Sequence, residues 1–85
     1  MMDLYAIKDK LVGFTGPIAM KNEDVAKRWF TSFCRDKKEK EFTESKYYEL
    51  WKIGNFNEEK GTIIGLQLSE LQLIMEGEQF DERKN

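Results

Sequence analysis

Histidine is absent from this 85-residue sequence, which contains only one cysteine and one proline. Histidine is the commonest general base and a frequent metal ligand at neutral pH, so the usual catalytic and zinc-binding arrangements are excluded. The single cysteine, Cys34, cannot form an internal disulfide, which favours a reducing cytoplasm. Because no histidine can activate it, we expect Cys34 to be a small buried apolar side chain. The sequence therefore predicts a protein that is not an enzyme and that uses no cofactor and no metal.

Long apolar runs are also missing. No stretch approaches the roughly 20 apolar residues that cross a bilayer, and the first ten residues, MMDLYAIKDK, do not resemble a secretory signal. We therefore expect no contact with a membrane. A chain of 85 residues allows one domain. So small a domain buries a modest fraction of its surface and often gains core by binding a partner chain.

Charge is unevenly distributed along the chain. The formal net charge is −2, which argues against strong non-specific binding to nucleic acid. Residues 21–40 nevertheless contain seven bases and four acids, whereas residues 41–85 contain five bases and ten acids. Clustered bases neutralise phosphates, so this segment is the candidate nucleic-acid site, with an ordinary charged helix face as the simpler alternative. The candidate residues are Lys21, Lys27, Arg28, Arg35, Lys37, Lys38 and Lys40.

The patterning predicts a small α+β domain at residues 1–68, in which β-β-α-β-β elements form an antiparallel sheet packed on one helix. The first two strands are expected at residues 4–7 and 12–14, and Gly16-Pro17 should end the second at a sheet edge. Asn22 is a suitable helix N-cap. The helix should end in the run DKKEKE, residues 36–41, as a solvated loop or a frayed last turn. Its apolar stripe is Val25, Ala26, Trp29, Phe30 and Phe33.

A hairpin follows the helix, with strands at residues 47–56 and 62–68 joined by the turn NEEKG. Gly61 can supply the positive φ that such a turn requires. Residues 69–85 form a C-terminal extension whose first part is ambiguous. SELQ fits a helical capping box, whereas LQLIME fits a further strand, and a frayed tail follows.

The first arm of this hairpin has apolar side chains on both faces. Trp51 and Ile53 point one way, whereas Tyr48, Leu50 and Phe56 point the other. One helix covers one face of a sheet, and a contiguous exposed apolar surface usually marks an interface. We therefore predict a homodimer built on the sheet, with Tyr48, Leu50 and Phe56 at or near the contact.

Three segments of the sequence are typical of one viral family. They are LYAIKD at residues 4–9, GFTGPIAMKNEDVAKRWF at residues 13–30 and YYELWKIGNFNEEKGTI at residues 47–63. With these segments in this order, the chain resembles the small non-structural protein of gokushovirus-type microviruses, the C-type protein that is often labelled DNA-binding. The most specific part is the pattern aromatic–Leu–Trp–x–Ile–Gly–x–Phe–Asn followed by Gly61.

The resemblance implies a non-enzymatic role in the host cytoplasm, at the change from duplex replication to single-stranded genome synthesis and packaging. The expected partners are single-stranded or replicative-form DNA and the phage replication or procapsid proteins. It implies no catalytic or ligand residues. The alternative is a protein–protein interaction module that contacts phage replication or capsid proteins without binding DNA. The net charge favours the module, and the basic segment favours DNA.

Overall fold

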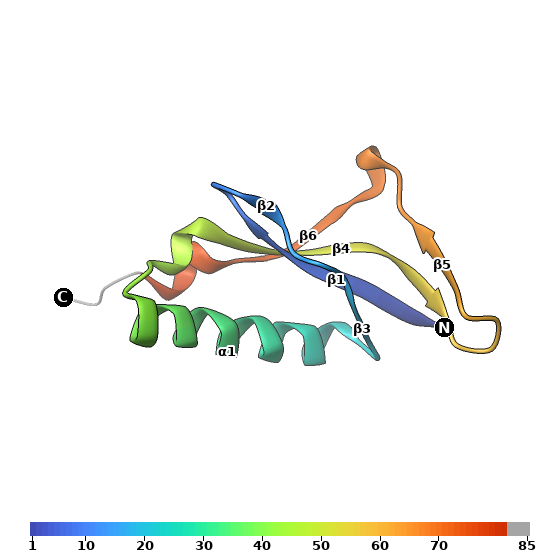
Figure 1. The fold of residues 1–85 in the computed structure, drawn as a ribbon, viewed down its shortest axis with the longest axis horizontal. Helices are drawn as coiled ribbons and strands as arrows, with labels where there is room; N and C mark the ends of the chain where they lie inside the picture. Colours follow the sequence, from blue (N-terminus) through green and yellow to red (C-terminus); the bar gives the residue numbers. More distant parts are fainter. Residues whose placement is uncertain (82–85) are drawn as a thin grey trace.

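The computed structural model describes residues 1–81 as one antiparallel sheet with a single long helix against one face (Figure 1). Three short 3₁₀ turns, η1 (Ser45–Tyr47), η2 (Leu68–Glu70) and η3 (Gly77–Phe80), connect or end the elements. The helix and strands are β1 (Met2–Asp9), β2 (Gly13–Phe14), β3 (Ile18–Met20), α1 (Glu23–Glu41), β4 (Tyr48–Asn57), β5 (Thr62–Gly65) and β6 (Gln72–Glu76).

The long strands β1 and β4 pair along their whole length and form the centre of the sheet. The short strands β2 and β3 both pair with the outer edge of β1, and β5 and β6 both pair with β4. The predicted α+β class is confirmed, with two strands more than the four expected. One of them, β3, begins directly after Pro17, which is tolerated there because β3 lies at a sheet edge.

The helix α1 begins as predicted and ends later than predicted. The Asn22 side chain accepts a hydrogen bond from the Val25 backbone N–H at 2.9 Å, which satisfies one free donor of the first turn. The run DKKEKE, expected to be a loop or a frayed last turn, is helical to Glu41. Its charges are spaced four residues apart, so opposite charges meet on the helix surface and support the last turns.

The core lies between α1 and the sheet face that it covers. Ala26, Phe30 and Cys34 are fully or almost fully buried against Tyr5, Ile7, Met20, Tyr48 and Leu50. Burial of Cys34 confirms its prediction as a small apolar side chain. Trp29 and Phe33 are only partly buried, and Val25 is 39% exposed. The buried line of α1 is therefore rotated from the predicted stripe, toward Phe30 and Cys34.

A β-bulge divides β4 into two halves that face differently. Tyr5 pairs with Lys52 and Leu4 pairs with Gly54, so Ile53 is an extra residue with no partner on β1. Because side chains alternate along a strand, one extra residue exchanges the faces of everything that follows. Phe56 consequently lies on the face opposite Tyr48 and Leu50. The prediction that these three side chains share a face is wrong for Phe56.

The C-terminal extension predicted from residue 69 onward packs on the same sheet. Of the two alternatives for LQLIME, the structure has the strand, since β6 pairs with β4. The turn η3 then packs against η1 so closely that a Cβ atom added at Gly77 would overlap the Ser45 carbonyl oxygen. The end of the predicted frayed tail, residues 82–85, lies outside the described residues.

Candidate nucleic-acid interface

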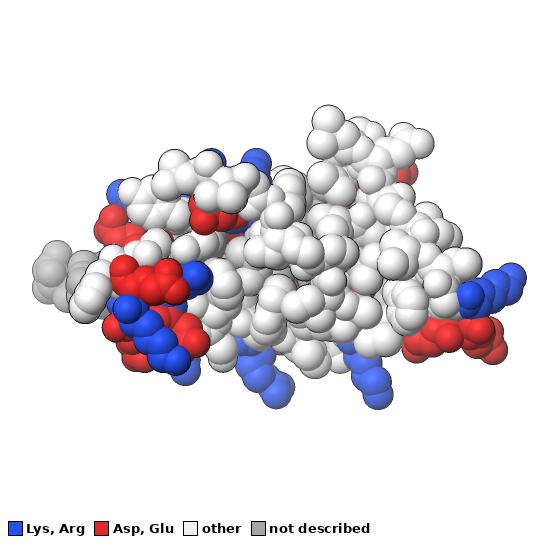
Figure 2. Space-filling model, in the orientation of Figure 1, with Lys and Arg blue, Asp and Glu red and all other residues white. Residues whose placement is uncertain are grey.

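Six of the seven candidate bases lie on α1. The seventh, Lys21, directly precedes the N-cap residue Asn22. Figure 2 shows basic side chains projecting singly along the α1 edge of the molecule, with acidic side chains crowded around them where the helix ends. The structure therefore collects six of the seven predicted residues on one element, and they form no continuous basic patch on the face in view.

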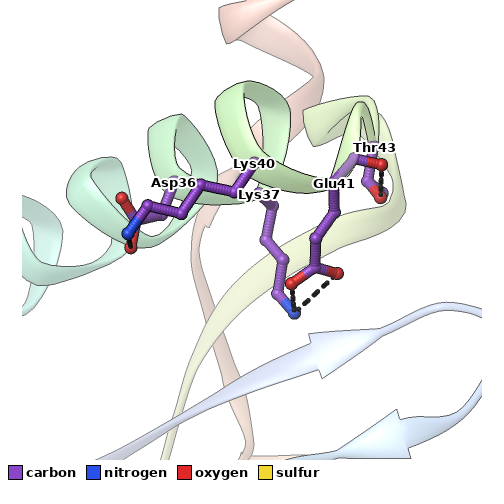
Figure 3. Close-up of polar contacts among 5 residues, drawn as sticks. All are labelled: Asp36, Lys37, Lys40, Glu41 and Thr43. Carbon is purple, nitrogen blue, oxygen red and sulfur yellow. Dashed lines mark hydrogen bonds and ion pairs between the residues drawn. The ribbon is translucent and has the colours of Figure 1, made fainter.

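Four of the seven bases form ion pairs with acids. Three of these pairs join residues one helical turn apart, and Figure 3 shows the two at the end of α1. Each paired base offers less net positive charge to a phosphate. The pairs are Lys27–Glu23 at 3.2 Å, Lys37–Glu41 at 3.0 Å, Lys40–Asp36 at 3.7 Å and Lys38–Asp81 at 2.8 Å.

The pair between Lys38 and Asp81 ties the C-terminal segment to the helix. Asp81 also accepts hydrogen bonds from the backbone N–H groups of Ser45, at 3.0 Å, and Lys46, at 2.6 Å. Desolvation acts to raise the pKa of Asp81, but the Lys38 contact and these two N–H groups outweigh it and lower the pKa below its usual value. Lys38 therefore has a structural role and is a weak candidate for DNA contact.

Three candidate bases remain, Lys21, Arg28 and Arg35, and we call them the basic row. All three are exposed, and none forms an ion pair within residues 1–81. Arg28 and Arg35 are seven residues apart on α1, which places them on one side of the helix and about 10 Å apart along its axis. Asp24 and Glu39 lie one turn from these arginines and reduce the local positive potential.

The sheet face opposite α1 has no helix against it among the described residues, and we call it the open face. It contains Phe14, Trp51 and Leu73, which lie side by side across β2, β4 and β6. The rings of Phe14 and Trp51 meet edge to face with centroids 6.2 Å apart, and Phe14 and Leu73 are each a little under half exposed. The Lys8 ammonium lies 5.7 Å from the Phe14 ring centroid.

Aromatic rings can stack on the bases of a single strand, but those of residues 47–51 are distributed between core and surface. Tyr48 is buried and Tyr47 packs against the core, whereas Trp51 is partly exposed on the open face. The indole N–H of Trp51 donates to Glu49 at 3.0 Å. Phe14, which sequence reasoning did not single out as functional, belongs to the same surface. The alternation of Val12 and Phe14 was the signal that could have indicated it.

Two of the three residues predicted at or near the dimer contact are buried within the chain. Leu50 is completely buried and Tyr48 is 6% exposed, because α1 and the residues packed around it cover them. These two side chains are therefore not on the surface of the chain. Phe56, by contrast, is partly exposed on the open face, where it pairs with Ile63 of β5.

The hollow between α1 and η1 contains the only cysteine. It is lined by Thr31, Cys34, Arg35, Lys38, Ser45 and Phe80. Burial raises the pKa of the Cys34 thiol to about 11, so the thiol is protonated and unreactive at neutral pH. Within residues 1–81 no cluster of three or more Cys, Asp and Glu side chains is arranged to hold a metal ion.

Comparison with protein-family models identifies the chain's relatives. The model of the Phage ORF5 protein family matches residues 2–80, which is nearly the whole chain and includes every helix and strand. The chain belongs to the Phage ORF5 protein family. It is a phage protein, as the sequence resemblance implied at this coarser level. No curated protein and no solved structure matches it. In the described part of the chain, no helix is both long and apolar enough to cross a bilayer.

Proposed function

We propose that this phage protein is a non-catalytic accessory that binds single-stranded DNA during genome replication and packaging in the host cytoplasm. The observation that supports the proposal is the basic row, because Lys21, Arg28 and Arg35 are the candidate bases that form no ion pair with a described acid. Two exposed arginines about 10 Å apart on one side of a helix can each contact a phosphate of a flexible strand. The resemblance to the C-type microvirus protein supplies the biological setting.

The expected affinity is modest and depends on salt. Each phosphate neutralised on a single strand contributes about −0.7 to the slope of log K against log salt concentration. Three contacts from the basic row therefore predict a slope of about −2. A slope near −5 would require all seven candidate bases, including the four that are paired with acids.

The test is a fluorescence-anisotropy titration of a labelled single strand at about 20 and about 200 mM salt. The double variant Arg28→Gln with Arg35→Gln should flatten the slope by about 1.4, since two contacts are lost. A matched control, Lys27→Gln with Lys40→Gln, removes the same charge from ion-paired positions of the same helix and should change the slope less. Equal effects of the two double variants would show that net charge matters and the basic row does not.

A second candidate function is a protein–protein interaction module, and a specific observation favours it. Ile63, Ile64 and Leu68 are 65%, 56% and 87% exposed on consecutive elements that contain no charged side chain between Gly61 and Ser69. Exposed apolar surface of this kind usually marks an interface. Absence of single-strand binding by the wild-type protein at about 20 mM salt would refute the DNA proposal and favour this function. Titration against the purified phage replication and procapsid proteins would then identify the partner.

A further inference from the structure

The strand β5 is an edge strand with unusual properties. It ends the strand order β2-β1-β4-β5, so one of its sides is paired with β4 and the other is free. All four of its residues are exposed, and its central residues are both isoleucine. Free edges present unpaired backbone groups that can template pairing with another strand, and natural proteins usually protect them with charge, proline or a bulge.

The other edges of this sheet carry such protection. Strand β3 follows Gly16-Pro17, and β2 is only two residues long. Strand β6 contains a register shift at Ile74 and ends in Glu76. By contrast, β5 pairs with β4 in unbroken register and contains no proline and no charge.

The direction of the β5 backbone groups follows from one hydrogen bond just beyond the end of the strand. The Leu66 N–H donates to the Ile53 carbonyl oxygen at 2.8 Å, so the backbone N–H and C=O groups of Leu66 face β4. Backbone groups alternate along an antiparallel strand, so those of Ile64 and Thr62 also face β4. The N–H and C=O of Ile63 therefore point to the free edge, at the centre of the most apolar part of the strand.

We propose that β5 pairs antiparallel with β5 of a second copy of this chain, about a two-fold axis that passes between the two Ile63 residues. In this register each Ile63 donates to and accepts from its counterpart, and the two side chains meet on the open face. Thr62 faces Ile64 of the other copy on the opposite face. The uncharged stretch from Gly61 to Ser69 brings no like charges into contact, which makes the edge complementary to itself.

The geometry limits the assembly to two chains. Pairing about a two-fold axis uses the same edge of both copies and leaves neither β5 free, so the dimer is closed. The protected edges elsewhere in the sheet disfavour extension into a fibre. Since β5 has only four residues, the contact is smaller than the roughly 1,200–2,000 Å² of stable interfaces, and we expect dissociation in the micromolar range or above.

Sedimentation equilibrium from about 5 to about 500 micromolar tests the dimer. Wild-type protein should change from monomer to dimer across this range. Ile63→Lys places a charge at the centre of the edge and should weaken the dimer by about tenfold or more. The matched control Leu68→Lys adds the same charge to a more exposed apolar residue of the next element and should leave the equilibrium within about twofold. Thermal melts confirm that each variant is folded, which is expected because both residues are exposed.

A cross-link tests the register independently. Directly opposed residues of a hydrogen-bonded antiparallel pair have Cα atoms about 5.5 Å apart, within the range that a disulfide spans. Ile63→Cys should therefore yield a disulfide-linked dimer under mild oxidation, whereas Thr62→Cys, which faces Ile64 of the other copy, should not. A wild-type chain that stays monomeric at about 500 micromolar, or a dimer insensitive to Ile63→Lys, would overturn the proposal. So would equal cross-linking of the two cysteine variants.

Discussion

Replacement of Phe30 by alanine is the most direct perturbation of the core. The Phe30 side chain is 0% exposed, lies at the centre of α1 and contacts the sheet residues that α1 covers. Its ring centroid is 6.2 Å from that of Phe80, so the substitution also removes support for η3. Truncation of a fully buried phenylalanine typically costs about 3–5 kcal/mol, because the lost transfer free energy is accompanied by a cavity.

That loss is large for this chain. A domain of this length is expected to have a free energy of unfolding of about 4–13 kcal/mol. Each kcal/mol changes the melting temperature of such a domain by about 4–8 °C, so Phe30→Ala should lower it by roughly 12 °C or more, or abolish folding. Circular dichroism with temperature and with urea provides the measurement.

The chain offers a matched control for the same chemical change. Phe42 is 89% exposed just after α1, so Phe42→Ala should alter the free energy of unfolding by less than about 0.5 kcal/mol. A Phe30→Ala variant that melts within a few degrees of wild type would refute the assignment of Phe30 to the core. Equal losses for the two substitutions would refute the placement of the helix face.

Three further variants test local features of the structure by thermal and urea denaturation. Phe42→Gly should stabilise the protein by about 1 kcal/mol, because Phe42 has φ 55°, a left-handed conformation that disfavours residues with a Cβ; no gain would contradict this helix end. Gly77→Ala should destabilise by more than about 1 kcal/mol since its Cβ would overlap the η1 backbone, whereas Gly16→Ala, whose Cβ meets nothing within 4 Å, should not. Asp81 has a lowered pKa in the folded state, so its stabilising effect is complete above the unfolded value of about 3.9 and is lost as the pH falls through the folded value. Asp81→Asn should therefore lower the free energy of unfolding at neutral pH and make it fall less steeply as the pH is lowered. An unchanged dependence on acidic pH would show that the Lys38 contact is unimportant.

The fold divides the seven candidate bases of residues 21–40 into two groups. Seven bases were equivalent candidates in the sequence, and the helix separates them into four that meet acids and three that do not. Three of those pairs could have been predicted, because residues four apart are neighbours on any helix. The fourth could not, since Lys38 and Asp81 are 43 residues apart and meet only when η3 packs against η1.

Local signals determined much of the fold from the sequence alone. The side chain of Asn22 caps α1 because it precedes the first free N–H groups, whatever the rest of the chain does. Gly61 has φ 70° at the end of the hairpin turn, as the turn chemistry required. The α+β class and burial of Phe30 likewise follow from helical spacing, and burial of Cys34 follows from its small apolar side chain; these are properties of a few neighbouring residues.

Tertiary structure decided those features that depend on contacts between segments far apart in the chain. The bulge at Ile53 exists only in relation to the register of β1, and it alone transfers Phe56 to the open face. The strand identity of residues 72–76 depends on the free edge of β4, because the segment's own pattern suited either a helix or a strand. Burial of Tyr48 and Leu50 follows from where α1 lies against the sheet. Register, edge pairing and burial are relations between segments far apart in the chain, so local propensity cannot determine them.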